Sequence, residues 1–359
     1  MLLFLHSKEN EGETMTLDIS TAAFKPVAAV KVRNIPSVSS QIPISDVFAG
    51  WKVRWGFGRN TYRVEPGLYA RGKPTTDSPV LVTANYKLTF DALRKELSGI
   101  DAWLLVLDTK GVNVWCAAGK GTFGTAELVR RAAAVGLKTV VSHRVLVLPQ
   151  LGAPGVAAHE VLKASGFRVV YGPVRAKDVP AFLGSGMKKD DAMRRVEFGI
   201  KDRLSVAPVE LAHAWPFILA AFAAAALLPL LSGRFSAASF GRLSLLFVSP
   251  IIVGAIVFPA LLPVLPFKPF ALKGTILGLV WALGASAALG LGVPDTVAYV
   301  LIATSLVSFI AMNFTGASTY TNLTGATLEV KIGLPIMIIA AIVGAVIAAI
   351  RFIPLFIRG

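Results

Sequence analysis

The apolar residues of this chain follow two different patterns, and the change between them falls near Ala214. From there to the C-terminus, five largely apolar runs succeed one another, at Ala214–Leu231, Leu243–Leu265, Gly274–Leu291, Thr296–Phe314 and Ile332–Ile350. Each run is close to the roughly 20 apolar residues that an α-helix needs to cross a bilayer, so the pattern predicts five transmembrane helices. The runs contain no Asp, Glu, Lys, Arg or His, whereas ion-coupled transporters usually bury such a group. They therefore favour an anchor or docking platform over a transporter.

Before Ala214, short β-branched runs alternate with segments of helical spacing. We predict strands at Pro79–Ala84, Ala102–Leu107, Lys138–Ser142 and Phe167–Tyr171. We predict helices at Thr89–Leu97, with Thr89 as the N-cap, at Thr125–Val135 and at Gly155–Ala164, the last two ended by Gly136 and Gly166. This alternation predicts an α/β fold with a parallel, Rossmann-like sheet and right-handed crossovers. In such sheets, ligands bind beyond the carboxyl ends of the strands.

These patterns divide the chain into three parts. Residues 1–78 are predicted to be a partly ordered lead-in, residues 79–205 the α/β domain, and residues 206–359 an all-α transmembrane domain of five helices. Basic residues near the span ends are slightly more numerous on the side of the α/β domain (Arg195, Lys201, Arg203, Lys268, Lys273 and Lys331) than on the other side (Arg234, Arg242, Arg351 and Arg358). The positive-inside rule therefore predicts a multi-pass protein of the cytoplasmic (inner) membrane, with the α/β domain in the cytoplasm.

The chain carries a formal net charge of +15, most of it before Ala214. A basic domain beside a bilayer attracts anionic lipid, nucleic acid or an acidic protein, but no aromatic residues interleave a basic patch, so we expect no nucleic-acid partner. The single cysteine, Cys116, excludes an internal disulfide and a cluster held by four cysteines of this chain. The N-terminal sequence has neither the basic region nor the apolar length of a signal peptide.

The stretch Gly111–Gly124 combines glycines with Trp115, Cys116 and Lys120, between a predicted strand and a predicted helix. Its glycines would let the backbone approach a bulky ligand closely. A phosphate-binding P-loop is disfavoured, because Val114 stands where that motif needs glycine and the residue directly after Lys120 is neither Ser nor Thr. Two interpretations remain. One is a packed loop around a buried cysteine; the other is a reactive thiol at the ligand-binding edge, with Lys120 and the start of the next helix favouring the thiolate.

The segment Asn113-Val-Trp-Cys-Ala-Ala-Gly-Lys120 resembles the signature of the corrinoid proteins that methylate mercury in anaerobic microbes. The soluble domain of that family is similar to the corrinoid subunit of the corrinoid iron–sulfur protein of acetyl-CoA metabolism. Val82–Asp91, Leu148–Gly155 and Tyr171–Ala176 also resemble this wider family. The resemblance runs from about Trp51 through the multi-span anchor, and the eight-residue segment is its specific part.

The resemblance implies a corrinoid-dependent methyltransferase. It implies that the domain binds a cobalamin-type cobamide, with Cys116 as the axial ligand of the cobalt. A methyl group from a methyltetrahydrofolate-linked donor protein would form methyl-cobalt and then pass to Hg(II), producing methylmercury. A small ferredoxin-like protein with two iron–sulfur clusters would be the reductant. A thiolate is a soft, electron-rich ligand, and it would push more charge toward the methyl group than a neutral imidazole does.

The resemblance also implies a set of contacts at three strand ends. The cofactor-binding residues would be Thr83, Asn85, Asn113, Val114, Trp115, Cys116, Ala117, Ala118, Gly119, Lys120, Gln150, Gly152 and Gly155, with Cys116 also the metal ligand and the catalytic residue. Gln150–Gly155 leads into a helix whose N-terminus would hold the phosphate of the cofactor's nucleotide tail. His143 and His159 lack the Asp-x-His-x-x-Gly context of histidine-ligated corrinoid enzymes, so we expect His143 in a loop and His159 on a solvated helix face.

A second hypothesis is a membrane protein that binds or transports a soft metal through Cys116 without a corrinoid. A thiolate suits a soft ion such as Hg(II). However, one thiol without a polar path through the predicted spans would make a poor transporter.

Overall fold

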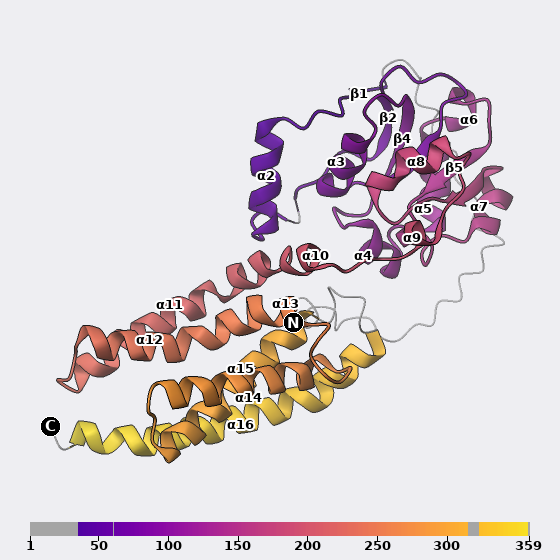
Figure 1. The fold of residues 1–359 in the computed structure, drawn as a ribbon. Helices are drawn as coiled ribbons and strands as arrows, with labels where there is room; N and C mark the ends of the chain where they lie inside the picture. Colours follow the sequence, from indigo (N-terminus) through magenta and orange to yellow (C-terminus); the bar gives the residue numbers. More distant parts are fainter. Residues whose placement is uncertain (1–34, 60, 315–322, 358–359) are drawn as a thin grey trace. The chain divides into compact units, whose positions relative to one another are not determined.

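The computed structural model describes residues 35–59, 61–314 and 323–357, which fall into two compact units (Figure 1). The first unit comprises residues 35–53 and 57–196, and the second comprises residues 54–56 and 197–357. The first 34 residues of the predicted lead-in lie outside the described residues. Each unit has hydrophobic clusters of its own.

The first unit is built on one six-stranded sheet with the strand order β1-β2-β4-β3-β5-β6. The strands are β1 (Ser37–Val38), β2 (Gly67–Arg71), β3 (Val80–Ala84), β4 (Ala102–Leu107), β5 (Val145–Leu148) and β6 (Arg168–Tyr171). β2 runs antiparallel to β4, and all other neighbouring strands are parallel. The predicted α/β fold is thus confirmed, but the sheet, which was predicted to be parallel, is mixed, with mostly parallel strands. The segment predicted as a lead-in supplies two of its strands.

Side chains of the central strands alternate between two cores, one on each face of the sheet. In β3, Val80 and Val82 enter one core and Leu81 enters the other, as the two-residue period of a strand requires. The first core is covered by α4 (Val114–Gly119), α5 (Thr125–Ala134), α6 (Leu137–Val140) and α7 (Ala158–Ser165), and the second by α3 (Lys87–Glu96) and α8 (Val179–Gly184). The remaining elements of this unit are α2 (Ile44–Arg54), η1 (Gln150–Gly152), η2 (Ala176–Asp178) and α9 (Asp191–Arg194).

One predicted strand is wrong. Lys138–Ser142 was expected to be a strand, but Leu137–Val140 forms the short helix α6, and the strand lies further on, at β5. Leu137 and Val140 are three residues apart and both buried, which fits the spacing of a helix better than that of a strand. The two glycine stops are confirmed, since Gly136 and Gly166 have left-handed backbone with φ of 61° and 73°.

The predicted N-cap of α3 is also wrong. The helix begins at Lys87, and Tyr86 is its N-cap, with no side-chain capping bond. Tyr86 is held in extended backbone by an antiparallel bridge to Arg63. The pairing with Arg63 ends the extended segment there, so the first turn forms two residues before Thr89.

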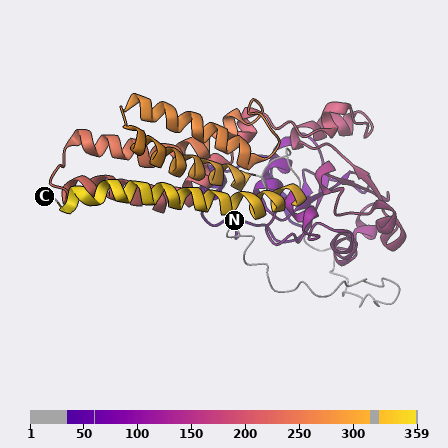
Figure 2. The ribbon, with the colours of Figure 1, turned by 90° about the horizontal axis from the view of Figure 1, so that it is seen from below.

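Within the described residues, the second unit contains five helices that are long and apolar enough to cross a membrane, one for each predicted span. They are Ile200–Leu231, Ala237–Leu261, Phe270–Ala288, Val293–Asn313 and Gly325–Arg351. The first combines α10 (Ile200–Leu204) and α11 (Ala207–Leu231). The second combines α12 (Ala237–Ile252), the π-helical turn η3 (Val253–Val257) and α13 (Phe258–Leu261). The others lie in α14 (Phe270–Ala288), α15 (Val293–Asn313) and α16 (Leu323–Ile357). Figure 2 shows them running lengthwise beside one another.

The helices start earlier than the predicted spans, so they include charged residues that the spans left out. Arg203 donates to the carbonyl oxygens of Pro259 and Ala260 at 3.2 and 2.6 Å, and Lys273 donates to those of Leu262 and Leu265 at 2.8 and 2.6 Å. These carbonyls lie at the end of the second span or just after it, where the last turn of a helix leaves oxygens without intrahelical partners. The cations therefore cap helix ends.

The small-residue spacing Gly274-xxx-Gly278 brings α14 against α15. A Cβ added at Gly274 would lie 2.6 Å from the Cβ of Ala311, and one added at Gly278 would lie 2.8 Å from the Cα of Thr304. These approaches leave no room for a side chain, as in the close helix packing that small residues allow in membranes.

We expect a chain ending at Val196 to fold without the membrane helices, because both cores of the sheet are complete before that residue. It should unfold in a single cooperative transition, measured by circular dichroism during heating. A matched chain ending at Ser165 lacks β6 and the buried Val169, and should not fold cooperatively. Loss of cooperative unfolding in both chains would show that the first unit needs the second.

Candidate functional site

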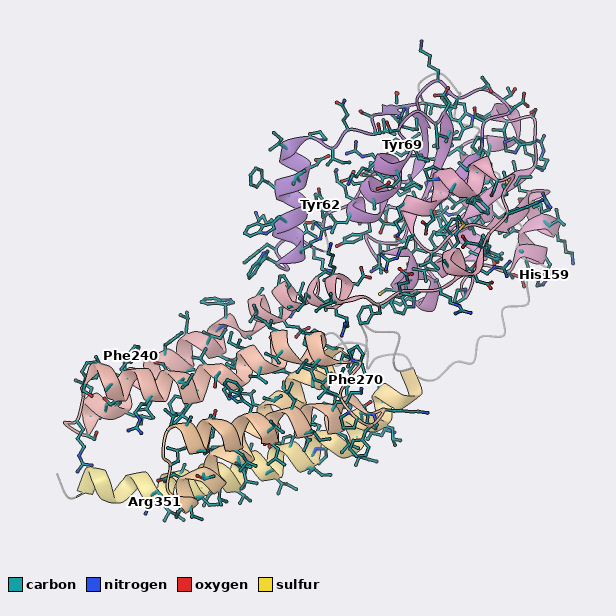
Figure 3. All side chains as sticks on the ribbon, viewed as in Figure 1. Tyr62, Tyr69, His159, Phe240, Phe270 and Arg351 are labelled. Atoms are coloured by element: carbon teal, nitrogen blue, oxygen red, sulfur yellow. The ribbon has the colours of Figure 1, made fainter. Side chains whose placement is uncertain are left out.

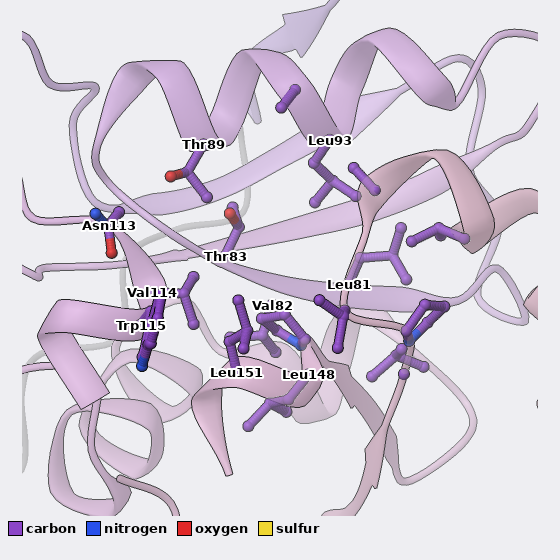
Figure 4. Close-up of a pocket in the computed structure, with 18 of the residues that line it drawn as sticks. Leu81, Val82, Thr83, Thr89, Leu93, Asn113, Val114, Trp115, Leu148 and Leu151 are labelled. Atoms are coloured by element: carbon purple, nitrogen blue, oxygen red, sulfur yellow. The ribbon is translucent and has the colours of Figure 1, made fainter. Parts of the chain in front are cut away.

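A cavity of about 390 Å³ opens at the carboxyl ends of β3 and β5 (Figure 4). From β3 the chain crosses to β4 on one side, and from β5 it crosses to β6 on the other. In open α/β sheets, ligands bind at this kind of switch in strand order. Its lining is mostly apolar: Leu81, Val82, Thr83, Leu88, Thr89, Ala92, Leu93, Asn113, Val114, Trp115, Val147, Leu148, Pro149, Leu151, Gly172, Pro173, Val174, Ala176 and Val179. We refer to it as the strand-end cavity.

The segment Asn113–Lys120 forms the short helix α4, with Asn113 as its N-cap. The side-chain oxygen of Asn113 accepts a hydrogen bond from the backbone N–H of Cys116 at 3.0 Å, which satisfies one of the free donors of the first turn. This segment was predicted to be a loop. The local signal for a helix start is Asn113, whose side-chain oxygen can cap the first turn. The helix fixes the direction of each side chain in the segment.

The two faces of α4 have different roles. Ala117 and Ala118 are buried, with 0% and 5% of their surface exposed, and they pack in the first core together with Val114. Trp115 and Cys116 are exposed. Because buried positions recur three and four residues apart on a helix, docking through the small residues turns the thiol outward. A packed loop around a buried cysteine is therefore excluded.

Trp115 lies on the edge of the strand-end cavity, beside Asn113 and Val114 (Figure 4). Thr83 also lines it from β3. The structure thus brings together four of the residues predicted for the site, and places Cys116 on the exposed face of the same helix turn.

Gly152 and Gly155 allow the backbone to pack closely around α4. A Cβ at Gly155 would lie 2.2 Å from the carbonyl oxygen of Phe123 and 3.0 Å from the Cα of Ala118, and one at Gly152 would lie 2.5 Å from the ring of Phe123. Phe123 itself is fully buried. These glycines face the protein's own chain, and a direct contact of either with a cofactor stays a prediction.

Asn85 is buried and organises the turn that follows β4. Its side-chain oxygen accepts hydrogen bonds from the backbone N–H groups of Thr109 and Gly111 at 3.1 and 2.9 Å and from the hydroxyl of Thr109 at 2.8 Å. Its amide donates to Asp108 at 3.3 Å. The turn needs this support, because Lys110 has the left-handed φ of 58° that non-glycine residues rarely adopt. Asn85 does not line the cavity, so its predicted cofactor contact would have to act through this turn.

The Asp108 carboxylate belongs to the same turn. Burial by itself would raise the pKa of Asp108, but hydrogen bonds from the Lys110 ammonium and backbone N–H hold it below its usual range. Because the folded pKa is depressed, the interaction stabilises the fold above the unfolded pKa of the carboxyl, and this contribution is lost as the pH falls through the folded pKa.

The remaining predicted residues, Gln150, Gly119 and Lys120, do not line the cavity. Gln150, in η1 between the lining residues Pro149 and Leu151, accepts a hydrogen bond from the Lys189 ammonium. Burial, together with the nearby Arg194, lowers the pKa of Lys189. Gly119 and Lys120 are exposed at the end of α4.

Neither histidine of this unit lies in the cavity lining. His143 hydrogen-bonds with Nε2 to the carbonyl of Ser78 at 3.0 Å and accepts with Nδ1 from the N–H of Val145 at 3.2 Å. Both ring nitrogens are thus used by the chain, and Nε2 carries the proton. His159 points outward from α7 (Figure 3), as predicted for a solvated helix face. In the described ranges, no three His, Cys, Asp or Glu side chains are grouped to hold a metal ion.

The part of the cavity lining that α3 contributes was not predicted from the sequence. Leu88, Thr89, Ala92 and Leu93 line it, and their spacing of three and four residues marks one face of a helix. The helix was predicted at Thr89–Leu97, but these residues were not predicted as part of the site. The pairs Leu88/Ala92 and Thr89/Leu93, which follow directly after a strand end, could have indicated a helix face beside the ligand site.

Comparison with known proteins finds that this unit is similar to subunits of acetyl-CoA decarbonylase/synthase complexes. Residues 57–183 match the family described as the CO dehydrogenase/acetyl-CoA synthase delta subunit. Two curated relatives are the acetyl-CoA decarbonylase/synthase complex subunits gamma of Methanopyrus kandleri, 39% identical over 128 residues, and Methanosarcina acetivorans, 37% identical over 130 residues. Each alignment covers 35% of this chain and 27% of the relative, so the chain spans about a quarter of the length of these relatives.

The matched range contains every residue predicted for the site. The expected similarity to proteins of acetyl-CoA metabolism is therefore confirmed for the α/β unit. The narrower resemblance to mercury-methylating proteins, which rests on Asn113–Lys120, stays a prediction.

Replacing Asn85 with Ala should destabilise the α/β unit by about 3 kcal/mol, since it leaves buried donors of the turn without an acceptor. As the control, Asn113→Ala removes a single capping bond on the surface, and should cost only about 1 kcal/mol. Urea unfolding of both variants measures the difference. Equal losses would show that the turn does not depend on Asn85.

Proposed function

We propose that the protein is a membrane-anchored, corrinoid-dependent methyltransferase that transfers a methyl group to Hg(II). The observation that carries this proposal is the exposed thiol of Cys116 on α4, next to Trp115 at the edge of an apolar cavity at the strand ends. The similarity of residues 57–183 to a subunit of an acetyl-CoA synthase complex supports the corrinoid, and the resemblance of Asn113–Lys120 to the mercury-methylation signature supports the substrate.

The residues around the cavity suit a large, mostly apolar cofactor. Ligand pockets are typically apolar with a few placed polar groups, and here Thr83, Thr89 and Asn113 are the polar side chains of the lining. The Cys116 sulfur would ligate the metal, while Trp115 and Val114 would contact the ring system. A corrinoid, when bound, supplies a cobalt that accepts a methyl group from one partner and gives it to another.

The type of ligand matters for the substrate. A thiolate is a soft donor, and the charge it supplies favours release of the methyl group to a soft electrophile such as Hg(II). The exposure of Cys116 and Trp115 leaves this edge of the unit open to partners. No lid from the same unit is needed for a donor protein or Hg(II) to reach it.

Two protein partners follow from the same proposal. The chain has a single cysteine, so electrons would come from a separate ferredoxin-like protein with two iron–sulfur clusters. The methyl group would come from a methyltetrahydrofolate-linked donor protein. Partners of these kinds would act in the cytoplasm, so the proposal includes a cytoplasmic α/β unit held at the inner membrane by five spans.

Direct capture of a soft metal by Cys116, without a corrinoid, is the less favoured alternative. A lone thiol would not require an apolar cavity beside it. Moreover, Arg203 and Lys273 in the membrane unit are engaged at helix ends. The visible spectrum of the purified protein distinguishes the two proposals, because only a cobamide absorbs there.

Replacing Cys116 with Ala should leave the unfolding temperature within a few degrees of the native value, since the side chain is exposed. The variant should still bind a cobamide, but its visible spectrum should shift through loss of the sulfur ligand, and methylation of Hg(II) should fall by at least about 100-fold, as for removal of a key catalytic group. Cys116→His keeps a ligand that donates less charge, and should also be impaired. Native methylation rates in a cobamide-loaded Cys116→Ala variant would refute the role of the thiol.

Filling the cavity tests whether it belongs to the cofactor site. Ala92→Phe places a ring at the cavity lining from an exposed position of α3, and should weaken cobamide binding at least about tenfold, or 1.4 kcal/mol. The control, Lys95→Phe, adds the same ring at an exposed position of α3 outside the lining, and should bind normally. If absorbance titration gives both variants the same affinity for cobamide, the cavity is not part of the cofactor site.

A further inference from the structure

Helix α2 (Ile44–Arg54) presents its apolar side to the outside of the α/β unit. Ile44, Val47, Phe48 and Trp51 recur at the spacing of one helical face, and between 57% and 75% of the surface of each is exposed. Phe57, shortly after the helix, is 56% exposed. We call these five residues the α2 stripe. Soluble proteins rarely expose a contiguous apolar patch of this kind unless it binds something.

The inner side of α2 carries the polar contacts instead. Asp46 forms ion pairs with Lys87 at 2.7 Å and with Arg94 at 2.9 Å, both on α3. Gly50 and Val53 are buried on the same side, and a Cβ at Gly50 would lie 3.0 Å from Leu88. The helix is thus fixed to the unit through its polar and small residues, which reverses the usual orientation of a surface helix.

Basic residues surround the α2 stripe. Lys52, Arg54 and Arg59 are all exposed on or just after the helix. Within residues 44–59, Asp46 is the one acidic residue, and it is turned inward to its ion pairs. The outer surface of this segment therefore combines large apolar side chains with positive charge.

We propose that the α2 stripe binds the surface of the membrane, inserting into the headgroup region of anionic phospholipid. This goes beyond the proposed function, and does not depend on it. Amphipathic helices with Trp and Phe on one face and Lys or Arg beside it lie in this way at the interface, and Trp is enriched at that depth. The basic residues complement the negative phosphates of the leaflet.

A bilayer is favoured over a protein partner because this chain is never far from one. Five helices of the same chain are suited to cross a membrane. A tether converts binding of the α2 stripe to lipid into an intramolecular event with a high effective concentration. A protein partner would need an acidic groove to fit the same surface.

The full chain in lipid vesicles provides the test. Cys116→Ala removes the native thiol, and a nitroxide is then attached at Val47→Cys in the α2 stripe or, as the control, at the exposed Lys163→Cys of α7. The vesicles contain about one-third phosphatidylglycerol, an anionic content of the order that attracts basic segments. In these vesicles, the label at position 47 should collide more often with oxygen than with a water-soluble nickel complex. The label at position 163 should show the reverse.

Charge reversal provides the second variant. The double variant Lys52→Glu, Arg59→Glu should move the label at position 47 into water, because it removes the attraction to lipid phosphate. The unchanged α2 stripe should also leave the lipid in pure phosphatidylcholine vesicles at high salt, which weaken the same attraction. Equal aqueous exposure at positions 47 and 163 in the anionic vesicles would overturn the proposal. Protection of position 47 only after addition of another protein would overturn it too, in favour of a protein-docking surface.

Discussion

The site depends on the close approach between α4 and the turn at Gly152–Gly155. Ala117 and Ala118 have side chains small enough to bring α4 against that turn, and Gly152 and Gly155 have no Cβ atoms to block the approach. Interiors are packed so densely that one added methylene is felt. A larger residue at Gly155 would therefore push α4 away from the sheet, and with it the edge of the cavity that Trp115 forms. The orientation of Cys116 is a consequence of packing on the opposite face of its own helix.

The elements that depend on short-range patterns were predictable. β4 occupies the predicted residues, α5 begins at Thr125 as expected, and Gly136 and Gly166 end helices through positive φ. The five spans follow from hydropathy alone, because lipid requires long apolar helices. The position of the site at the strand ends followed from the alternation of strands and helices. The third strand was predicted too early in the chain, but the region around Pro149 was still expected at the edge of the sheet where the structure places it.

The features that sequence reasoning missed are set by contacts between distant residues. β2 joins the sheet antiparallel to β4 by pairing residues that are 31 to 39 positions apart in the chain, and nothing local in its sequence specifies that partner. Asn85 was assigned to the ligand, because a polar residue at a strand end is what a binding site requires. In the fold, its hydrogen bonds go to the turn after β4, twenty-three to twenty-six residues away. Its role could be seen only once the two strand ends were adjacent.

The outward orientation of the α2 stripe is specified by the same kind of distant contact. If burial of apolar surface alone decided the orientation of α2, the helix would turn Val47, Phe48 and Trp51 inward. That rotation would separate Asp46 from Lys87 and Arg94, whose side chains are only 19% and 9% exposed. Lys87 and Arg94 would then share the single carboxylate of Asp91. Two largely buried cations with one acidic partner are less stable than with two, and this penalty opposes the gain from burying the stripe. The ion pairs therefore hold the apolar face in the solvent, where it is available for binding.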